Sequence, residues 1–429
     1  MASSRTLSPR LRWAVPAGVA AAVVAAFTVP SMVASATTDL PDITASELLA
    51  SVAEAESVPV PVSGTVVYTA RLGLPELPLS EMQGAGPLDL LGGSSTIRLW
   101  SDGKDRSRAA LLSSTSEYSV VRDGAEAWTY SSHDDEVVHY TVAPEDLAAY
   151  EKLEKAARTR SAPDVAGDLP TPTQAADALL AYAKMSTDVS VGTDAQIAGR
   201  DAYELVLTPR GDGSLVERVL VAVDAETRTP LRLQVWSTTD SATPALEVGF
   251  TDVTFAAPDD AVFDFTAPAG ATTREVEVPL PEPSGDAMHG PFPDGALLDD
   301  LGPGKGRTGD APEGVSVTGF GWESVVELRG VDVDKLLAGE PASERTRHER
   351  EPSPASEGAR DLYEELMSGA GTKMNDIDVA AILEQVTTEV PEGRLLSSAL
   401  LSVLVTDDDR VLVGAVPGET LRDLATRSG

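Results

Sequence analysis

Alternating apolar and polar residues dominate the first half of the chain. Between residues 63 and 72 apolar side chains fall at every second position from Val66 to Leu72, with polar or smaller residues between them. Because successive side chains of a strand point to opposite faces, this period predicts a half-buried β-strand. Residues 96–100 alternate in the same way and predict a second strand. The chain therefore opens its main structural unit with a pair of strands.

The connection between these two strands is unusually long and apolar. Hairpin loops usually have about two to five residues, and longer loops in compact domains are often functional. Residues 73–95 are rich in glycine and proline and also carry large apolar side chains: Leu74, Leu77, Leu79, Met82, Leu88, Leu90 and Leu91. We interpret this segment as a cover at the mouth of a lipid-holding sheet. A disordered insertion and a lid packed permanently on helices are the alternatives.

Further strands follow at short intervals. Turn signals separate several of them, including Asp123-Gly124 and Asp134-Asp135. The predicted strands are 106–112, 117–122, 126–131, 136–142, 188–191, 202–208, 215–223, 231–238 and 245–255. Short connections make neighbouring strands antiparallel, so these eleven strands form one meander.

Three helices accompany the predicted sheet. Thr44 and Glu47 form a capping box with Ile43 and Leu48 as a hydrophobic staple, which predicts a helix over about 44–56. Two more helices are predicted at about 144–158 and 173–185. Three helices can cover one face of the sheet. The predicted class is therefore α+β, with a large curved antiparallel sheet of about eleven strands.

The last third of the chain has a different character. Residues 269–314 lose periodicity and read as a flexible linker rich in proline and glycine. Residues 315–429 predict a C-terminal αβ extension, with strands at 315–328, 395–405 and 410–416 and helices near 361–367 and 376–389. Three strands seldom stand alone, so we expect this extension to pack on the main sheet or to lengthen it.

The N-terminus has the pattern of an export signal. Arg5, Arg10 and Arg12 precede an apolar run over 13–29, and Ala34-Ser35-Ala36 provides small residues for cleavage. Residues 1–36 are therefore predicted to be a signal peptide that sends the protein out of the cytoplasm, to the cell envelope or beyond. An uncleaved membrane anchor is the alternative, because the apolar run approaches the length that spans a bilayer.

Composition narrows the possible functions. The chain has no cysteine, which excludes disulfides, thiol catalysis and cysteine-bound zinc. It carries 68 acidic and 33 basic residues, a formal net charge of −35. So negative a surface repels nucleic acid, and we expect no nucleic-acid partner.

The motifs that carry catalysis or cofactors are missing or out of context. The run from Gly304 to Gly309 has the spacing of a dinucleotide fingerprint, but no predicted strand precedes it and no helix follows. His133 and His139 flank three acidic residues across a predicted hairpin, where a cation site is possible but a solvated hairpin end is the simpler interpretation. We expect no metal, no cofactor and no enzymatic activity. A hydrolase is the third function considered, behind two kinds of binding protein.

Apolar and aromatic side chains remain as candidate ligand contacts. A wide sheet with few large aromatic residues and only three helices is expected to leave an apolar cavity, and such cavities under a cover bind acyl chains. The predicted lining residues of the sheet are Val66, Tyr68, Trp100, Trp128, Tyr130 and Trp236. Each one singly has ordinary sheet packing as its alternative role.

Several motifs resemble those of the outer-membrane lipoprotein carrier (LolA-like) superfamily, in its exported high-GC-bacterial branch. That group includes the RseB/MucB-type envelope-stress regulators and the lipid-carrying lipoproteins of mycobacterial type. The resemblance covers about residues 40–265, within a predicted domain over 40–268, and rests on four short segments: 63–68, 121–130, 198–209 and 223–232. It implies a half-barrel of eleven antiparallel strands whose concave face is covered by helices, above a cavity for acyl chains.

Two functions follow as expectations. The first is an exported, non-enzymatic carrier of lipids or lipoproteins. The second is an envelope-stress regulatory module in which the same fold docks on a membrane anti-sigma partner. The long loop at 73–95 and the extension at 315–429 go beyond a minimal carrier.

Overall fold

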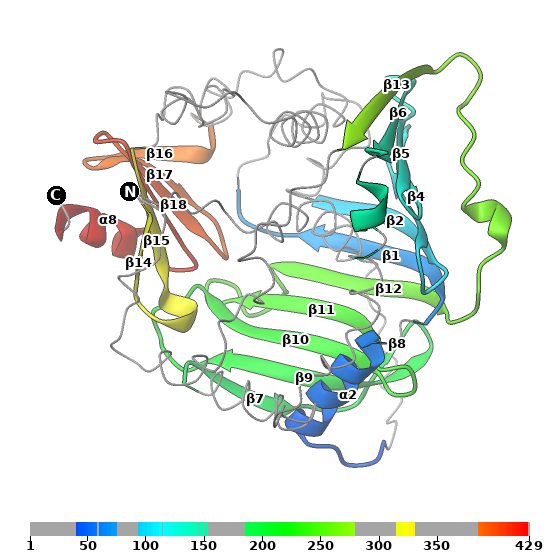
Figure 1. Cartoon of the computed structure of the whole chain (residues 1–429). Coiled ribbons are helices and arrows are strands. Elements are labelled where there is room, and N and C mark those ends of the chain that lie inside the picture. The colour runs from blue at the N-terminus through cyan, green and yellow to red at the C-terminus, as the bar shows by residue number, and fades with distance from the viewer. Residues whose placement is uncertain are drawn as a thin grey trace.

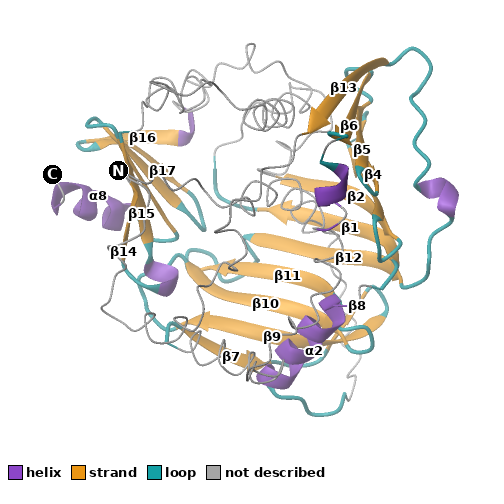
Figure 2. Cartoon of the chain, in the orientation of Figure 1, coloured by secondary structure: helices purple, strands orange, loops and turns teal. Residues whose placement is uncertain are grey.

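The computed structural model describes six stretches of the chain. They are residues 40–57, 60–74, 93–152 (without 114, 145 and 151), 185–278, 315–330 and 385–427. Strands make up most of these stretches, as Figure 2 shows, so the described part is mostly β rather than α+β. The predicted signal peptide, most of the loop at 73–95 and most of the linker and its flanks lie outside the described residues.

The larger sheet contains thirteen strands in the order β13-β6-β5-β4-β3-β2-β1-β12-β11-β10-β9-β7, with β8 paired to β9. It curves so that β4, β5, β6 and β13 stand edge-on in Figure 1. Its strands are β1 (Val62–Ala70), β2 (Gly93–Ser101), β3 (Arg106–Leu112), β4 (Glu117–Asp123), β5 (Glu126–Ser131), β6 (Glu136–Val142), β7 (Thr187–Val191), β8 (Ala195–Ile197), β9 (Arg200–Pro209), β10 (Val216–Asp224), β11 (Pro230–Ser237), β12 (Leu246–Thr254) and β13 (Thr272–Val278).

Eleven of these strands were predicted, but they form two meanders, β1 to β6 and β7 to β12, which are joined by the pairing of β1 with β12 rather than by β6 and β7. The last strand, β13, departs further from the prediction. β13 pairs with β6 in parallel, from Thr272 opposite Glu136 to Val278 opposite Val142. The sheet is therefore mixed, and the expectation of a purely antiparallel sheet was wrong. The segment after β12 crosses the outer side of the sheet through the short helix η3 (Asp260–Val262) and adds β13 to the free edge of β6, within what the sequence suggested was linker (Figure 1).

The C-terminal extension forms its own six-stranded sheet, in the order β14-β15-β19-β18-β17-β16, where three strands had been predicted. Helix α8 (Gly418–Arg427), which the sequence analysis missed, packs on it through Leu421 and Ala425. The strands are β14 (Val315–Thr318), β15 (Val325–Arg329), β16 (Thr387–Val390), β17 (Gly393–Ser397), β18 (Ser402–Thr406) and β19 (Arg410–Gly414), with η5 (Gly321–Glu323) between β14 and β15. Turns that were read as continuous strand divide 315–328 and 395–405 into two strands each.

Backbone contacts join the two sheets at their ends. The amide of Leu215 donates to the carbonyl of Ala415 over 2.7 Å, and the amide of Ala399 donates to the carbonyl of Leu72 over 2.7 Å. The buried hydroxyl of Ser237 donates to the carbonyl of Ala399 over 2.6 Å. The extension therefore packs beside the main sheet rather than lengthening it.

Helix α2 (Ala45–Ser57) begins at the predicted capping box. The amide of Thr44 donates to Glu47 Oε2 over 2.9 Å, and the amide of Glu47 donates to Thr44 Oγ1 over 3.2 Å. These bonds satisfy two amide groups that the first turn leaves free. Of the other two predicted helices, residues 147–150 are described and helical, and the remainder lies almost entirely outside the described residues. Within the described stretches no helix is long and apolar enough to cross a membrane.

Candidate functional site

One face of the main sheet carries a continuous row of apolar side chains across its central strands. Val66 lies directly opposite Ile97 on β2 and Phe250 on β12, and Ile97 lies opposite Leu111 on β3. Leu111 in turn lies opposite Tyr118 on β4. Directly opposite residues share a face. We call this side of the sheet the inner face, because α2 packs on the same side.

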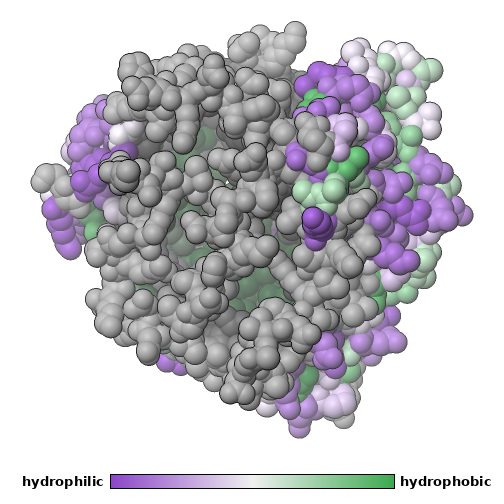
Figure 3. Space-filling view, viewed as in Figure 1, coloured by the Kyte–Doolittle hydropathy of each residue, from purple (hydrophilic) through white to green (hydrophobic). Residues whose placement is uncertain are grey.

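Helical cover of the inner face is confined to its two ends in the described residues. At one end Leu48 of α2, which is fully buried, packs with Tyr203, Leu205 and Val223 of β9 and β10. At the other end Tyr150, in the described helical turn, accepts a hydrogen bond from Arg122 over 2.9 Å. The described members of the central apolar cluster all come from strands or adjoining turns. In Figure 3 many of the described residues visible at the left and right margins of the molecule are hydrophilic.

The predicted cavity residues Val66 and Tyr68 both lie on the inner face. Val66 is 1% exposed, and Tyr68 is partly buried against the same cluster. Burial raises the pKa of the Tyr68 phenol above its ordinary value. Both side chains therefore belong to the apolar surface that the sequence analysis assigned to an acyl chain.

Trp100, Trp128 and Tyr130 lie on the opposite, outer face. Trp100 stands opposite Arg108. Trp128 stands opposite Val121 and His139, and Tyr130 stands opposite Ser119. The structure thus does not bring these three aromatic side chains together with Val66 and Tyr68. The sequence held a signal for this: Trp100 shares its strand face with Arg98, and Trp128 shares its face with Glu126.

Trp236 also lies away from the predicted cavity. It stands opposite Arg218 on β10, whose guanidinium carbon lies 4.1 Å from the centre of the indole ring. Leu233 and Val235, at alternate positions, stand opposite Val248 and Leu246. Val248 is opposite Tyr68 and so belongs to the inner face. Trp236 is therefore on the outer face, held by a cation–π contact.

Of the predicted lid residues only Leu74 is described, and it is partly buried. The other six (Leu77, Leu79, Met82, Leu88, Leu90 and Leu91) lie outside the described residues. The residue that precedes the loop is bonded to the second sheet, because the carbonyl of Leu72 accepts a hydrogen bond from the amide of Ala399. The loop therefore leaves the main sheet at the junction of the two sheets.

The second sheet has an apolar face of its own on the side away from α8. Val317 lies opposite Val326, which lies opposite Val413, and Val413 lies opposite Val403. Val317 is 60% exposed and Val326 is 37% exposed. The other face of this sheet holds Leu404 and Leu412 against α8. Figure 1 shows α8 on the side of the second sheet that faces away from the main sheet, so the valine row is turned toward the main sheet.

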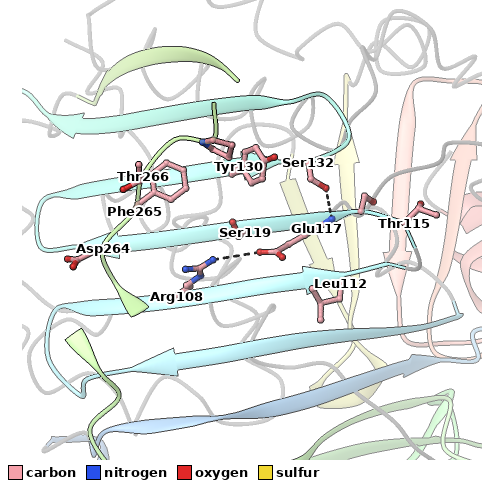
Figure 4. A pocket seen from close by; sticks show the side chains of 12 residues that line it. Arg108, Leu112, Thr115, Glu117, Ser119, Tyr130, Ser132, Asp264, Phe265 and Thr266 are labelled. Atoms are coloured by element: carbon pink, nitrogen blue, oxygen red, sulfur yellow. Dashed lines mark hydrogen bonds and ion pairs between the residues drawn. The ribbon is translucent and has the colours of Figure 1, made fainter. Parts of the chain in front are cut away.

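A pocket of about 590 Å³ lies on the outer face of the main sheet, between β3, β4, β5 and the segment 264–268. Figure 4 shows Arg108 and Glu117 side by side in it, with Phe265 and Thr266 crossing the strands near Tyr130. The lining residues are Arg108, Leu112, Thr115, Ser116, Glu117, Ser119, Tyr130, Ser132, Asp264, Phe265, Thr266 and Pro268. No sequence pattern pointed to this pocket, because its two walls are far apart in the chain.

The predicted pair of histidines does not form a metal cluster. His139 lies between two carboxylates, with Nδ1 2.7 Å from Glu275 and Nε2 3.3 Å from Glu126. His133 is exposed in the turn before β6. Among the described residues no group of three histidine or acidic side chains could hold a metal ion. His139 instead fixes β13 to β5 and β6.

Comparison with known proteins finds similarity only in fold. No family model matches the chain, and no curated protein matches it. The Pseudomonas aeruginosa MucA/MucB complex is 16% identical with a TM-score of 0.37, covering 89% of this chain and 96% of that chain. A structure of MucB has 16% identity and a TM-score of 0.34, with 89% and 96% covered.

A LolA superfamily protein, NE2245 from Nitrosomonas europaea, has 12% identity and a TM-score of 0.19, covering 52% of this chain and 99% of that chain. These identities and TM-scores are low, and the family inferred from the motifs stays a prediction. The chain is similar in fold to MucB and LolA-superfamily proteins, and this similarity identifies no ligand.

Proposed function

We propose that the protein is an exported, non-enzymatic binding protein that holds acyl chains of a lipid or lipoprotein between its two sheets. The observation that supports this most is the valine row of the second sheet. Val317 and Val326 leave apolar side chains 60% and 37% exposed on a face turned toward the main sheet. Exposed apolar patches mark ligand or partner sites. Covering such a patch removes apolar surface from water, which is favourable by about 25 cal/mol per Å².

The inner face of the main sheet supplies the other apolar wall. Val66, Ile97 and Leu111 form its central row, and helical cover among the described residues is confined to the ends of the sheet. These three side chains are at most 4% exposed, so in this proposal an acyl chain would lie against a surface that is already shielded from water. Polar head groups would remain toward the hydrophilic margins.

The loop at 73–95 serves as the entrance in this proposal. Its base is bonded to the second sheet through Leu72 and Ala399, at the point where the two sheets meet. The leucines and the methionine of the loop, from Leu74 to Leu91, would close over a bound chain. Burying a single leucine is worth about 1.5–3 kcal/mol, so two or three such contacts suffice to close the entrance.

Native mass spectrometry with lipid extraction of residues 37–429 tests the proposal. We expect the protein isolated from a membrane-containing fraction to carry acyl lipid, and Val326→Glu to lower the occupancy at least tenfold. The charge would face the chain at a position that is already partly exposed, so the fold should tolerate it. Val60→Glu is the matched control, because Val60 is 38% exposed and precedes the opposite end of β1. A lipid-free wild type, or equal loss in both variants, contradicts the proposal.

A second candidate is a regulatory module that docks on a membrane protein such as an anti-sigma factor. In one of the similar structures MucB is in complex with MucA. For this chain the candidate is favoured by β14, an outer strand with one neighbour and an exposed Val317. Outer strands offer unpaired backbone groups to an incoming strand.

Capture experiments separate the two candidates. A carrier retains lipid and captures no specific membrane protein. A regulator is isolated empty, yet captures one membrane protein through residues 315–429. Ser316→Pro would remove a backbone donor from β14 and should abolish that capture without changing lipid content.

A further inference from the structure

The segment 260–268 covers the outer pocket like a roof, and hydrogen bonds to β3 fix it in place in the absence of a ligand. Arg106 Nη2 lies 2.7 Å from Asp260 Oδ1, and Arg108 Nη1 donates to the carbonyl of Val262 over 3.3 Å. Phe263 is 2% exposed beneath this segment. A pocket whose walls are already ordered pays little conformational entropy on binding.

An aromatic stack holds the next part of the roof. His139 stacks on Trp128 with ring centres 4.8 Å apart and an angle of 2° between planes. Trp128 stacks on Phe265 at 5.9 Å. Phe265 therefore enters the pocket with its position set by the strands below, so Trp128 acts as a support of the pocket.

The polar groups of the pocket both donate and accept hydrogen bonds. Arg108 Nη2 lies 3.8 Å from Glu117 Oε1, so a positively charged donor and a negatively charged acceptor lie next to each other. Hydroxyl groups surround this pair, and each can donate or accept. They belong to Thr115, Ser116, Ser119, Ser132, Tyr130 and Thr266. Burial raises the pKa of the Tyr130 phenol, and the charge of Asp135 adds to this, so the hydroxyl keeps its proton at neutral pH.

This set of groups discriminates between ligand classes. A small anion would meet the carboxylates of Glu117 and Asp264 as well as Arg108. An acyl chain would cover Arg108 and Glu117 without offering them a hydrogen bond, which is costly. A neutral polyol with an apolar ring face satisfies both the hydroxyl-rich wall and the ring of Phe265.

We propose that this pocket binds a neutral saccharide unit. The site lies on the outer face, behind the apolar inner face, and is independent of the acyl-chain site proposed above. In this assignment Arg108 and Glu117 bond the sugar hydroxyls, and Phe265 packs against the C–H groups of the ring. The protein would then contact a glycan on one face and an acyl chain on the other.

Isothermal titration of the full exported chain with trehalose, maltose and N,N′-diacetylchitobiose tests the assignment. We expect at least one of these sugars to bind at millimolar concentration or better. Glu117→Ala should weaken binding about tenfold, because hydrogen bonds to charged groups are the strongest of the set. Thr266→Val should weaken it about two- to tenfold. Thr254→Val, an exposed threonine of β12 outside the pocket, is the matched control and should change nothing.

Acetate and dodecanoate serve as competing probes. Acetate binding that Glu117→Ala strengthens, without any sugar binding, would overturn the assignment in favour of an anion site. Failure of all three sugars, or sugar binding insensitive to both pocket variants, would also overturn it. Lipid content measured on Glu117→Ala should equal that of the wild type, so the acyl-chain proposal stands or falls separately.

Discussion

The buried carboxylate of Asp224 offers a sharp test of what holds the main sheet together. Asp224 ends β10 and is fully buried. It accepts hydrogen bonds from Arg200 at 2.5 and 2.9 Å, and from the amide and hydroxyl of Thr227 at 2.6 and 2.9 Å. These residues belong to the motifs 198–209 and 223–232. Their role in the structure is to fix the start of β9 to the turn that follows β10.

Replacing Asp224 with asparagine keeps the shape and removes the charge. The amide offers one oxygen where the carboxylate offered two, so at least one donor faces an NH₂ group. Leaving one partner of a buried charge pair unmatched costs about 3–5 kcal/mol, and partial exposure of Arg200 reduces this to about 2–4 kcal/mol. For a domain of this size we expect the melting temperature to fall by roughly 4–16 °C.

Chemical denaturation at pH 7 measures this loss directly. Asp188→Asn is the matched control, since Asp188 also pairs with an arginine, Arg210, but the Asp188 and Arg210 side chains are 67% and 47% exposed. Exposed pairs contribute about 0–1 kcal/mol, so this variant should unfold close to the wild type. A loss below about 0.5 kcal/mol for Asp224→Asn would refute the reasoning, because it would mean that the buried pair contributes no more than a surface pair.

The pH dependence of stability checks independently whether the charge of Asp224 stabilises the fold. Burial by itself raises the pKa of Asp224, but the hydrogen bonds from Arg200 and Thr227 outweigh it, so the pKa lies below its ordinary value. A carboxyl group with a lowered folded pKa contributes stability that is complete above its unfolded pKa of about 3.9 and is lost as pH falls through the folded value. The gap between wild type and Asp224→Asn should therefore be full at pH 7 and narrow below about pH 4. An equal gap at pH 7 and pH 3 would show that the charge is not the cause.

Three further substitutions test the other parts of the fold. Leu404→Ala empties a fully buried position under α8 and should cost about 2–5 kcal/mol by denaturant unfolding, while Leu401→Ala, at a 40% exposed position, should cost far less. Gly64→Ala places a Cβ 2.3 Å from the carbonyl oxygen of Asp252, so we expect a lower melting temperature, and an unchanged one would contradict the β1–β12 register. Ser237→Ala removes the hydroxyl that bonds the second sheet, and should cost about 1–3 kcal/mol; differential scanning calorimetry showing no change would count against a fixed junction.

Local patterns predicted the elements of the main sheet well. The capping box at Thr44 and Glu47 forms the predicted bonds, and Gly124 occupies the predicted tight turn with φ +57°. Both signals act between residues a few positions apart, so their geometry is settled by short-range sterics and hydrogen bonding. The strands themselves follow from alternation for the same reason.

Assignment of side chains to faces was less successful. The aromatic residues were grouped by type, although Trp100 and Trp128 alternate with the inner-face residues Leu99 and Thr129 rather than sharing their face. Which side chains of one strand share a face can be read from its sequence, because they alternate. Which set of alternate side chains in one strand shares a face with which set in the next strand depends on the register of pairing, and a shift of one residue reverses the assignment.

The sequence by itself determined eleven strands of the main sheet and the tight turn at Gly124, the start of helix α2 and the acidic, cysteine-free character of the protein. Each of these depends on composition or on neighbours within one or two turns of chain. Only the tertiary structure decided that β13 adds in parallel to β6, that the extension builds a separate sheet, and that segment 264–268 closes a pocket over β3–β5. The contacts of β13 and of segment 264–268 join residues more than a hundred positions apart, and β15 pairs with β19 across 81–89 positions. All of them depend on which sheet edge or apolar face is left free once the local elements have formed.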